Sequence, residues 1–77
     1  MNNRLIYEKE SLIEYIDILI GIYTVKANKN NKLFNIVNEL DILRSVVVNI
    51  SSEEEVAIYK NKILHLENNV SGDNDGR

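Results

Sequence analysis

The chain has 77 residues, no Cys, one His and a formal net charge of −3. A chain of this length forms one domain near the lower size limit for a self-supporting core, so a disulfide, a metal or an oligomer usually stabilises it. The lack of Cys excludes disulfides and thiolate metal sites, and one His cannot form a multi-His site within a single chain. With 44% hydrophobic residues and neither kind of cross-link, the composition favours self-association.

Charge and hydropathy exclude two classes of partner. Nine basic residues stand against twelve acidic ones, and no segment has the basic excess that binding of nucleic-acid phosphates requires. The longest wholly apolar runs are only three residues, far short of a membrane-spanning helix. The N-terminus MNNRLIYEKE lacks the pattern of a secretory signal. We therefore expect a cytoplasmic protein that contacts neither nucleic acid nor membrane directly.

The first predicted helix covers residues 4–27. Within this segment the polar residues follow steps of four and three, which place them on one narrow stripe of a helix: Glu10, Glu14, Asp17, Gly21 and Thr24. The other positions from Leu12 to Val25 are apolar or aromatic. A strand over 16–25 is the alternative, but it would place apolar side chains on both faces, and the continuous stripe decides for a helix. Gly21 is then a candidate for close approach between two helices.

Two further helices are predicted, over residues 31–49 and 52–68. In the second, steps of three and four define a core-facing seam: Leu33, Ile36, Leu40, Leu43, Val47 and Ile50. Asn30 or Asn31 is its candidate cap. The third begins with Ser52 and Glu55 at the spacing of a capping box, and its seam follows the same steps: Val56, Tyr59, Ile63, Leu66 and Val70.

These elements predict an all-α fold with one helical domain over residues 1–70 and a disordered tail over 71–77. Because the connection between the first two helices is short, they should form an antiparallel hairpin, against which the third helix packs. The first helix is apolar around most of its circumference, so a second copy of the chain is expected to cover part of it. The predicted fold is thus a homodimeric helical bundle, whose interface residues are Leu12, Ile18, Ile22, Val25, Ile42 and Val46.

The sequence predicts no catalytic, cofactor-binding or metal-binding residue, and hence no enzyme. His65 has no Ser, Cys or Asp at a spacing typical of catalysis, and the acids of the first helix lie on its solvated stripe. The candidates for binding a partner protein are Tyr7, Glu53, Glu54 and Glu55. An exposed Tyr is a common interface anchor, and the three acids either complement the helix dipole or contact a basic surface.

One pair of segments resembles a known family. LIEYIDIL (12–19) followed by VNELDIL (37–43) is similar to the helical hairpin of the Spo0E-like aspartyl-phosphate phosphatases, whose second helix carries a Ser-Gln-Glu-Leu-Asp motif. Glu39, Leu40 and Asp41 match this motif, whereas Val37 and Asn38 stand in place of its Ser and Gln. The resemblance implies dephosphorylation of a response regulator, with Asp41 as the site residue. Read from the sequence alone, Asp41 is a solvated acid that pairs with Arg44.

The predicted function is that of a bacterial or phage-type regulator that binds a host regulatory protein and modulates its activity. Small phage factors that act on a host transcription repressor resemble this chain in size, acidity and helical, dimeric character. The alternatives are the phosphatase just described and a small DNA-binding regulator. Charge disfavours the second alternative, since a recognition helix that begins with Glu53, Glu54 and Glu55 would face phosphates.

Overall fold

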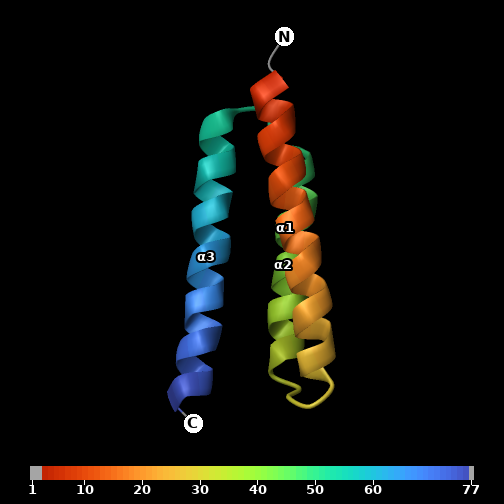
Figure 1. Cartoon of the computed structure of the whole chain (residues 1–77), viewed down its shortest axis with the longest axis vertical. Coiled ribbons are helices and arrows are strands. Elements are labelled where there is room, and N and C mark those ends of the chain that lie inside the picture. The colour runs from red at the N-terminus through yellow and green to blue at the C-terminus, as the bar shows by residue number, and fades with distance from the viewer. Residues whose placement is uncertain (1–2, 77) are drawn as a thin grey trace.

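A computed structural model of the chain describes the backbone of residues 3–76 and the side chains of residues 3–69. It contains three α-helices, α1 (Asn3–Ala27), α2 (Leu33–Val48) and α3 (Glu53–Gly76), and no strand in the described part. The molecule is elongated, 47 × 20 × 14 Å, with α3 beside the pair formed by α1 and α2 (Figure 1). The prediction of an all-α chain with three helices is confirmed.

A lysine from α1 fixes the relative direction of α1 and α2. Lys9 Nζ donates hydrogen bonds to the backbone carbonyls of Val48 at 3.0 Å and Ile50 at 2.7 Å. These bonds join the first third of α1 to the end of α2, so the two helices run in opposite directions (Figure 1). The ammonium pairs with carbonyls that a helix end leaves without intrahelical donors, and it faces the negative end of the helix dipole.

The turn between α1 and α2 differs in detail from the prediction. Asn30 Oδ1 accepts a hydrogen bond from the backbone N–H of Lys32 at 3.1 Å, and the Leu33 N–H donates to the Asn30 carbonyl at 2.9 Å. Lys32 holds the N-cap position and makes no side-chain capping bond. Asn30 therefore stabilises the turn that precedes α2, and neither Asn30 nor Asn31 caps the helix. As a result α2 spans Leu33–Val48 and not 31–49.

The start of α3 follows the prediction closely. The Glu55 N–H donates to Ser52 Oγ at 3.3 Å, and the Ser52 hydroxyl donates to the Glu55 carboxylate at 3.2 Å. This pairing satisfies a backbone donor that the helix start leaves free. The helix continues to Gly76, beyond the predicted end at residue 68. The side chains of the predicted tail, 71–77, lie outside the described residues, and the disorder of that tail stays a prediction.

The predicted seams of α2 and α3 form the core together with one face of α1. The buried apolar residues of the described chain are Leu12, Ile16, Leu19, Tyr23, Ala27, Leu33, Leu40, Val47, Ile50, Val56 and Ile63. The remaining seam residues with described side chains are partly buried against this cluster: Ile36, Leu43, Tyr59 and Leu66. The predicted polar stripe of α1 is exposed along its whole length, from Glu10 to Thr24. Periodicity thus selected the inward and outward positions of these helices correctly.

One prediction about α1 is wrong, and another finds no support within the single chain. Leu12 is only 5% exposed and belongs to the core of the single chain, so it has almost no surface left for a dimer interface. Gly21 is not a point of close approach within the chain, because a Cβ built on it meets no atom within 4 Å. Both assignments were made from the spacing of residues along α1. Spacing alone does not show on which sides of α1 the helices α2 and α3 pack.

Candidate functional site

A groove runs between α1 and α3, with a volume of about 610 Å³. Leu12 and Val56 are its most deeply buried lining residues, and Tyr15, Ala57 and Leu64 add further apolar surface. Tyr7 and Glu53, two of the four predicted partner-binding residues, also line this α1/α3 groove. The structure therefore brings together two residues that are far apart in the sequence, at an open and largely apolar site.

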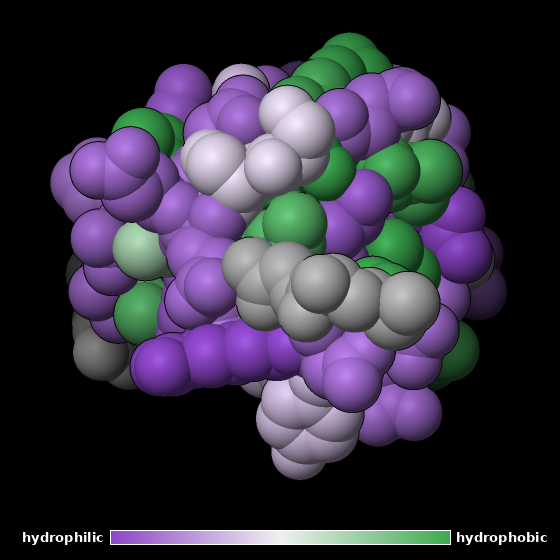
Figure 2. All heavy atoms as spheres, turned by 90° about the horizontal axis from the view of Figure 1, so that it is seen from above, coloured by the Kyte–Doolittle hydropathy of each residue, from purple (hydrophilic) through white to green (hydrophobic). Residues whose placement is uncertain are grey.

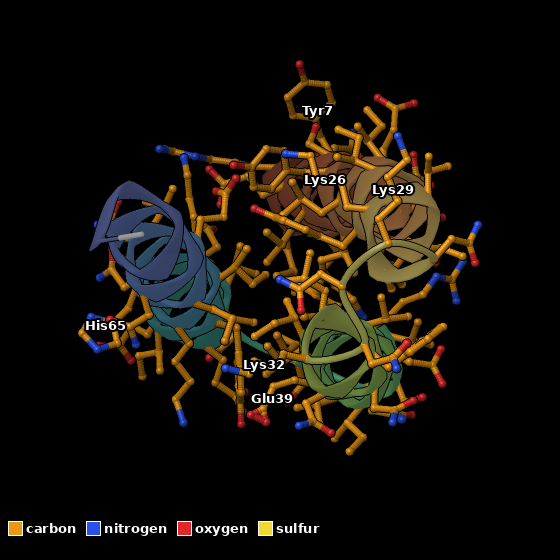
Figure 3. The ribbon with its side chains drawn as sticks, turned by 90° about the horizontal axis from the view of Figure 1, so that it is seen from below. Tyr7, Lys26, Lys29, Lys32, Glu39 and His65 are labelled. Atoms are coloured by element: carbon orange, nitrogen blue, oxygen red, sulfur yellow. The ribbon has the colours of Figure 1, made fainter. Side chains whose placement is uncertain are left out.

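Tyr7 is the most exposed large apolar side chain of the described residues, at 71%. Figure 3 shows its ring projecting outward from α1, away from the other helices. A Tyr supplies a large, rigid contact area with a polar tip, and such residues often contribute most of the binding free energy at protein interfaces. The predicted exposure of Tyr7 is confirmed, and its role in binding stays a prediction.

One end of the α1/α3 groove carries an ion-pair cluster. Arg4 Nε lies 3.3 Å from Glu8 Oε2 and 3.4 Å from Glu53 Oε1, so it links the starts of α1 and α3. Exposed pairs of this kind add little to the free energy of unfolding, but they orient the carboxylates. Glu54 and Glu55 line neither groove beside α3, and Glu55 is bonded to Ser52. Figure 2 shows this end of the molecule, where hydrophilic and hydrophobic side chains lie side by side. The first turn of α3 contributes three acids here, Glu53, Glu54 and Glu55.

A second link between α1 and α3 lies further along the groove. The Tyr15 hydroxyl donates a hydrogen bond to the Glu67 carboxylate, and 52 positions separate the two residues. The bond, with burial and the negative charge of Glu67, raises the pKa of Tyr15 to about 12. Burial, followed by the charge of Glu67, also raises the pKa of Tyr23. The Tyr15–Glu67 hydrogen bond holds α3 to α1 while the Tyr15 phenol is protonated.

The raised pKa of Tyr15 predicts a loss of stability at high pH. A phenol whose pKa is higher in the folded state stabilises fully below its unfolded pKa of 10, and this contribution disappears as pH rises through about 12. The difference between pKa values of 10 and about 12 corresponds to at most about 3 kcal/mol, and solvent screening reduces it because both groups are partly exposed. We therefore expect the free energy of unfolding to fall over this range by about 1 kcal/mol more in the natural chain than in Tyr15→Phe.

Urea unfolding at several pH values measures this difference in the free energy of unfolding. Tyr7→Phe is the control, because it removes a different tyrosine hydroxyl. Equal pH dependence in the natural chain and Tyr15→Phe would contradict the assignment.

A second groove lies between α2 and α3, with a volume of about 720 Å³. His65 lines it together with Lys62 and Glu39, and Ile42, a predicted interface residue, is also part of its wall. Figure 3 shows His65 and Glu39 on different helices and well apart. Across the described side chains, no three His, Asp or Glu residues gather closely enough to hold a metal ion. Ile42 is the only one of the six predicted interface residues that lines this α2/α3 groove.

The remaining predicted interface residues are surface positions. Ile18, Ile22 and Val25 are exposed on α1 and Val46 on α2, and none of them lines either groove. The structure therefore divides the six predicted interface residues among the core, a groove and the outer surfaces of two helices. Ile18, Ile22 and Val25 form a row on α1 at spacings of four and three, and Ile42 and Val46 lie one turn apart on α2.

Asp41, the residue implied by the phosphatase resemblance, is exposed on α2. The predicted pair with Arg44 is wrong, because Arg44 Nε instead binds Asp17 Oδ1 on α1 at 2.6 Å. The hydrogen bond with Asp17 and the charge of that carboxylate raise the pKa of Arg44. The Arg44–Asp17 pair joins α1 to α2, and it leaves the Asp41 carboxylate accessible.

Three lysines lie at the end of the molecule opposite the ion-pair cluster of Arg4, Glu8 and Glu53. Lys26, Lys29 and Lys32 surround the turn between α1 and α2 (Figure 3). Lys26 Nζ lies 5.7 Å from the centroid of the Tyr23 ring, a cation–π contact. The two ends of the bundle therefore carry opposite charges, with acids at the start of α3 and lysines at the α1–α2 turn.

Comparison of the chain with known protein families, with curated proteins and with solved structures finds no match. No helix in the described part of the chain has the length and apolar content needed to cross a membrane. The function must therefore be argued from the surface of the bundle itself.

Proposed function

We propose that the chain is a non-enzymatic, cytoplasmic interaction module that binds a helical segment of a regulatory protein in its α1/α3 groove. The observation that carries this proposal is the combination of an open, mainly apolar groove with Tyr7 at its wall. An amphipathic helix is the usual ligand of such a groove, because its apolar stripe replaces the missing neighbour of a bundle. A helix of the partner would pack in this groove as the fourth helix of the bundle.

The charges of the α1/α3 groove select the partner further. Glu8 and Glu53 line one end and both pair with Arg4, with the exposed Glu54 nearby on α3. This excess of carboxylates favours a partner helix with Lys or Arg at the corresponding end. Lys60 lines the groove further along α3 and favours an acidic residue there. The proposed ligand is thus an amphipathic helix of opposite charge order.

A homodimer forms part of the proposal. Exposed Ile18, Ile22 and Val25 leave an aliphatic row on α1 that a second copy would cover. A dimer presents two equivalent grooves, which suits a partner that is itself twofold symmetric, such as a dimeric transcription repressor. If the grooves bind one conformation of that partner more tightly, the partner's equilibrium shifts towards it. We thus propose that the chain is a bacterial or phage-type regulator that shifts the conformational equilibrium of its partner.

Tyr7→Ala tests the proposed site. We expect the captured partner to bind about 30-fold more weakly, because loss of an interface Tyr in such a position costs about 2 kcal/mol. Ala57→Arg, which places a long charged side chain in the groove, should abolish capture from host lysate. Ile58→Ala serves as the matched control, since Ile58 is exposed on α3 and lines neither groove. Equal capture by all four proteins would exclude the α1/α3 groove.

The phosphatase remains the second candidate, because Asp41 is exposed and Arg44 is engaged elsewhere. It is distinguished by turnover of an aspartyl-phosphorylated response regulator, which Asp41→Ala would abolish and Tyr7→Ala would leave intact. Affinity for random DNA at low salt would instead point to the lysines at the α1–α2 turn.

A further inference from the structure

The outer face of α1 is a row of exposed residues that contributes to neither groove. It consists of Glu10, Glu14, Ile18, Ile22 and Val25, which succeed one another at helical spacings of four and three, with Gly21 beside Ile22. Ile18 is 55% exposed and Ile22 is 45% exposed, although both are β-branched aliphatic residues. The row is therefore acidic at its start and aliphatic over its second half.

We propose that this outer face packs against the same face of a second copy, with the two α1 helices antiparallel about a twofold axis near Ile18 and Ile22. The proposal rests on the homodimer of the proposed function and specifies its arrangement. Each α1 then lies along the other over the length of the row. Residues 10–25 extend roughly 23 Å along the helix, enough for four turns of contact.

Charge complementarity selects the antiparallel arrangement. The outer face begins with Glu10 and Glu14 and is followed by Lys29 in the turn, while Lys26 lies beside the end of this face with its Nζ over the Tyr23 ring. Among the described residues, no ion pair engages Glu10, Glu14 or Lys29. Antiparallel helices place the acidic start of one beside the basic end of the other, whereas a parallel dimer would bring like charges together.

Gly21 gives a second, independent argument. A Gly inside a helix lowers helix propensity, and within the single chain nothing uses the space at this position, because a Cβ would meet no atom within 4 Å. Gly21 lies on the outer face, one helical turn from Ile18 and next to Ile22. Its missing side chain allows the backbones of two α1 helices to approach closely beside the axis. A second copy therefore accounts for a residue that the single chain leaves unexplained.

The arrangement also keeps the proposed binding site free. The residues of the outer face line neither groove, and Tyr7, which lines the α1/α3 groove, borders this face one turn before Glu10. A dimer formed through α1 can thus present both grooves to a partner.

A single introduced thiol tests the arrangement, because the natural chain has no Cys. In Ile18→Cys, the two equivalent thiols lie near the axis, and mild oxidation at micromolar concentration should link most of the protein into a disulfide dimer. In Val25→Cys, antiparallel helices hold the equivalent residues roughly 15 Å apart along the helix axis, so this variant should remain unlinked. Ile58→Cys, on the exposed side of α3, is the control for collisional cross-linking.

The outcomes separate the arrangement from the dimer itself. A monomeric mass by light scattering across dilution would overturn both the dimer and its arrangement. A dimeric mass with cross-linking at Val25 as efficient as at Ile18 would overturn the antiparallel arrangement alone. A charge exchange gives a second test: Glu10→Lys with Glu14→Lys should weaken the dimer at least tenfold, and adding Lys26→Glu with Lys29→Glu should restore it. Failure of the second pair to restore the dimer contradicts the predicted juxtaposition.

Discussion

Replacing Ile63 by alanine is expected to detach α3 and to remove a large part of the stability of the chain. Ile63 is fully buried, and Val56 is the other buried side chain that α3 contributes from its described residues. An Ile→Ala change in a core leaves a cavity and costs about 2–5 kcal/mol. A domain of this size has a free energy of unfolding of only about 4–12 kcal/mol. The grooves on both sides of α3 leave few other contacts to compensate.

The adjacent residue supplies the control for this prediction. Leu64 is 41% exposed, and Leu64→Ala removes a similar volume at the next position of the same helix. Urea unfolding followed by circular dichroism should show a clear drop in midpoint for Ile63→Ala and a change below about 1 kcal/mol for Leu64→Ala. Comparable losses for the two variants would mean that α3 packs on a different face from the one described.

Much of this architecture could be predicted because it depends on local periodicity. A seam such as Leu33, Leu40 and Val47 repeats with the turn of the helix, so spacing alone marks the face that must be buried. The capping spacing of Ser52 and Glu55 likewise needs only four neighbouring residues. The exposure of Ile18 and Ile22 followed from the same reasoning, as positions left over once the seams were assigned.

The contacts between helices could not be predicted in this way. Lys9 reaches carbonyls 39 and 41 positions away, and Tyr15 meets Glu67 across 52 positions. Such pairs depend on how the helices are rotated and displaced relative to one another, which no short-range pattern encodes. Leu12 was misplaced for the same reason. On a helix that is apolar around most of its circumference, spacing does not separate the side that faces the core from the side that faces a partner.

Replacing Ile18 and Ile22 together by aspartate is expected to convert the dimer into a folded monomer. Both side chains are exposed in the single chain, so aspartate remains hydrated there and the three-helix core is unaffected. In the dimer each change would bury a carboxylate against apolar neighbours, and four such carboxylates would lie near one axis. Burial of an unpaired charge costs several kcal/mol, which corresponds to a loss of affinity of a thousandfold or more.

The measurement must separate dissociation from unfolding, because either would lower the mass of the assembly. Light scattering should give the mass of one chain, while the helical circular dichroism at low temperature stays close to that of the natural protein. Ile58→Asp is the matched control: Ile58 is as exposed as Ile18 but lies on α3, so this variant should remain a dimer. A variant that lost its helices would show that α1 packs with Ile18 and Ile22 inward, against the described core. If helicity and the dimeric mass both persisted, a different surface would form the dimer.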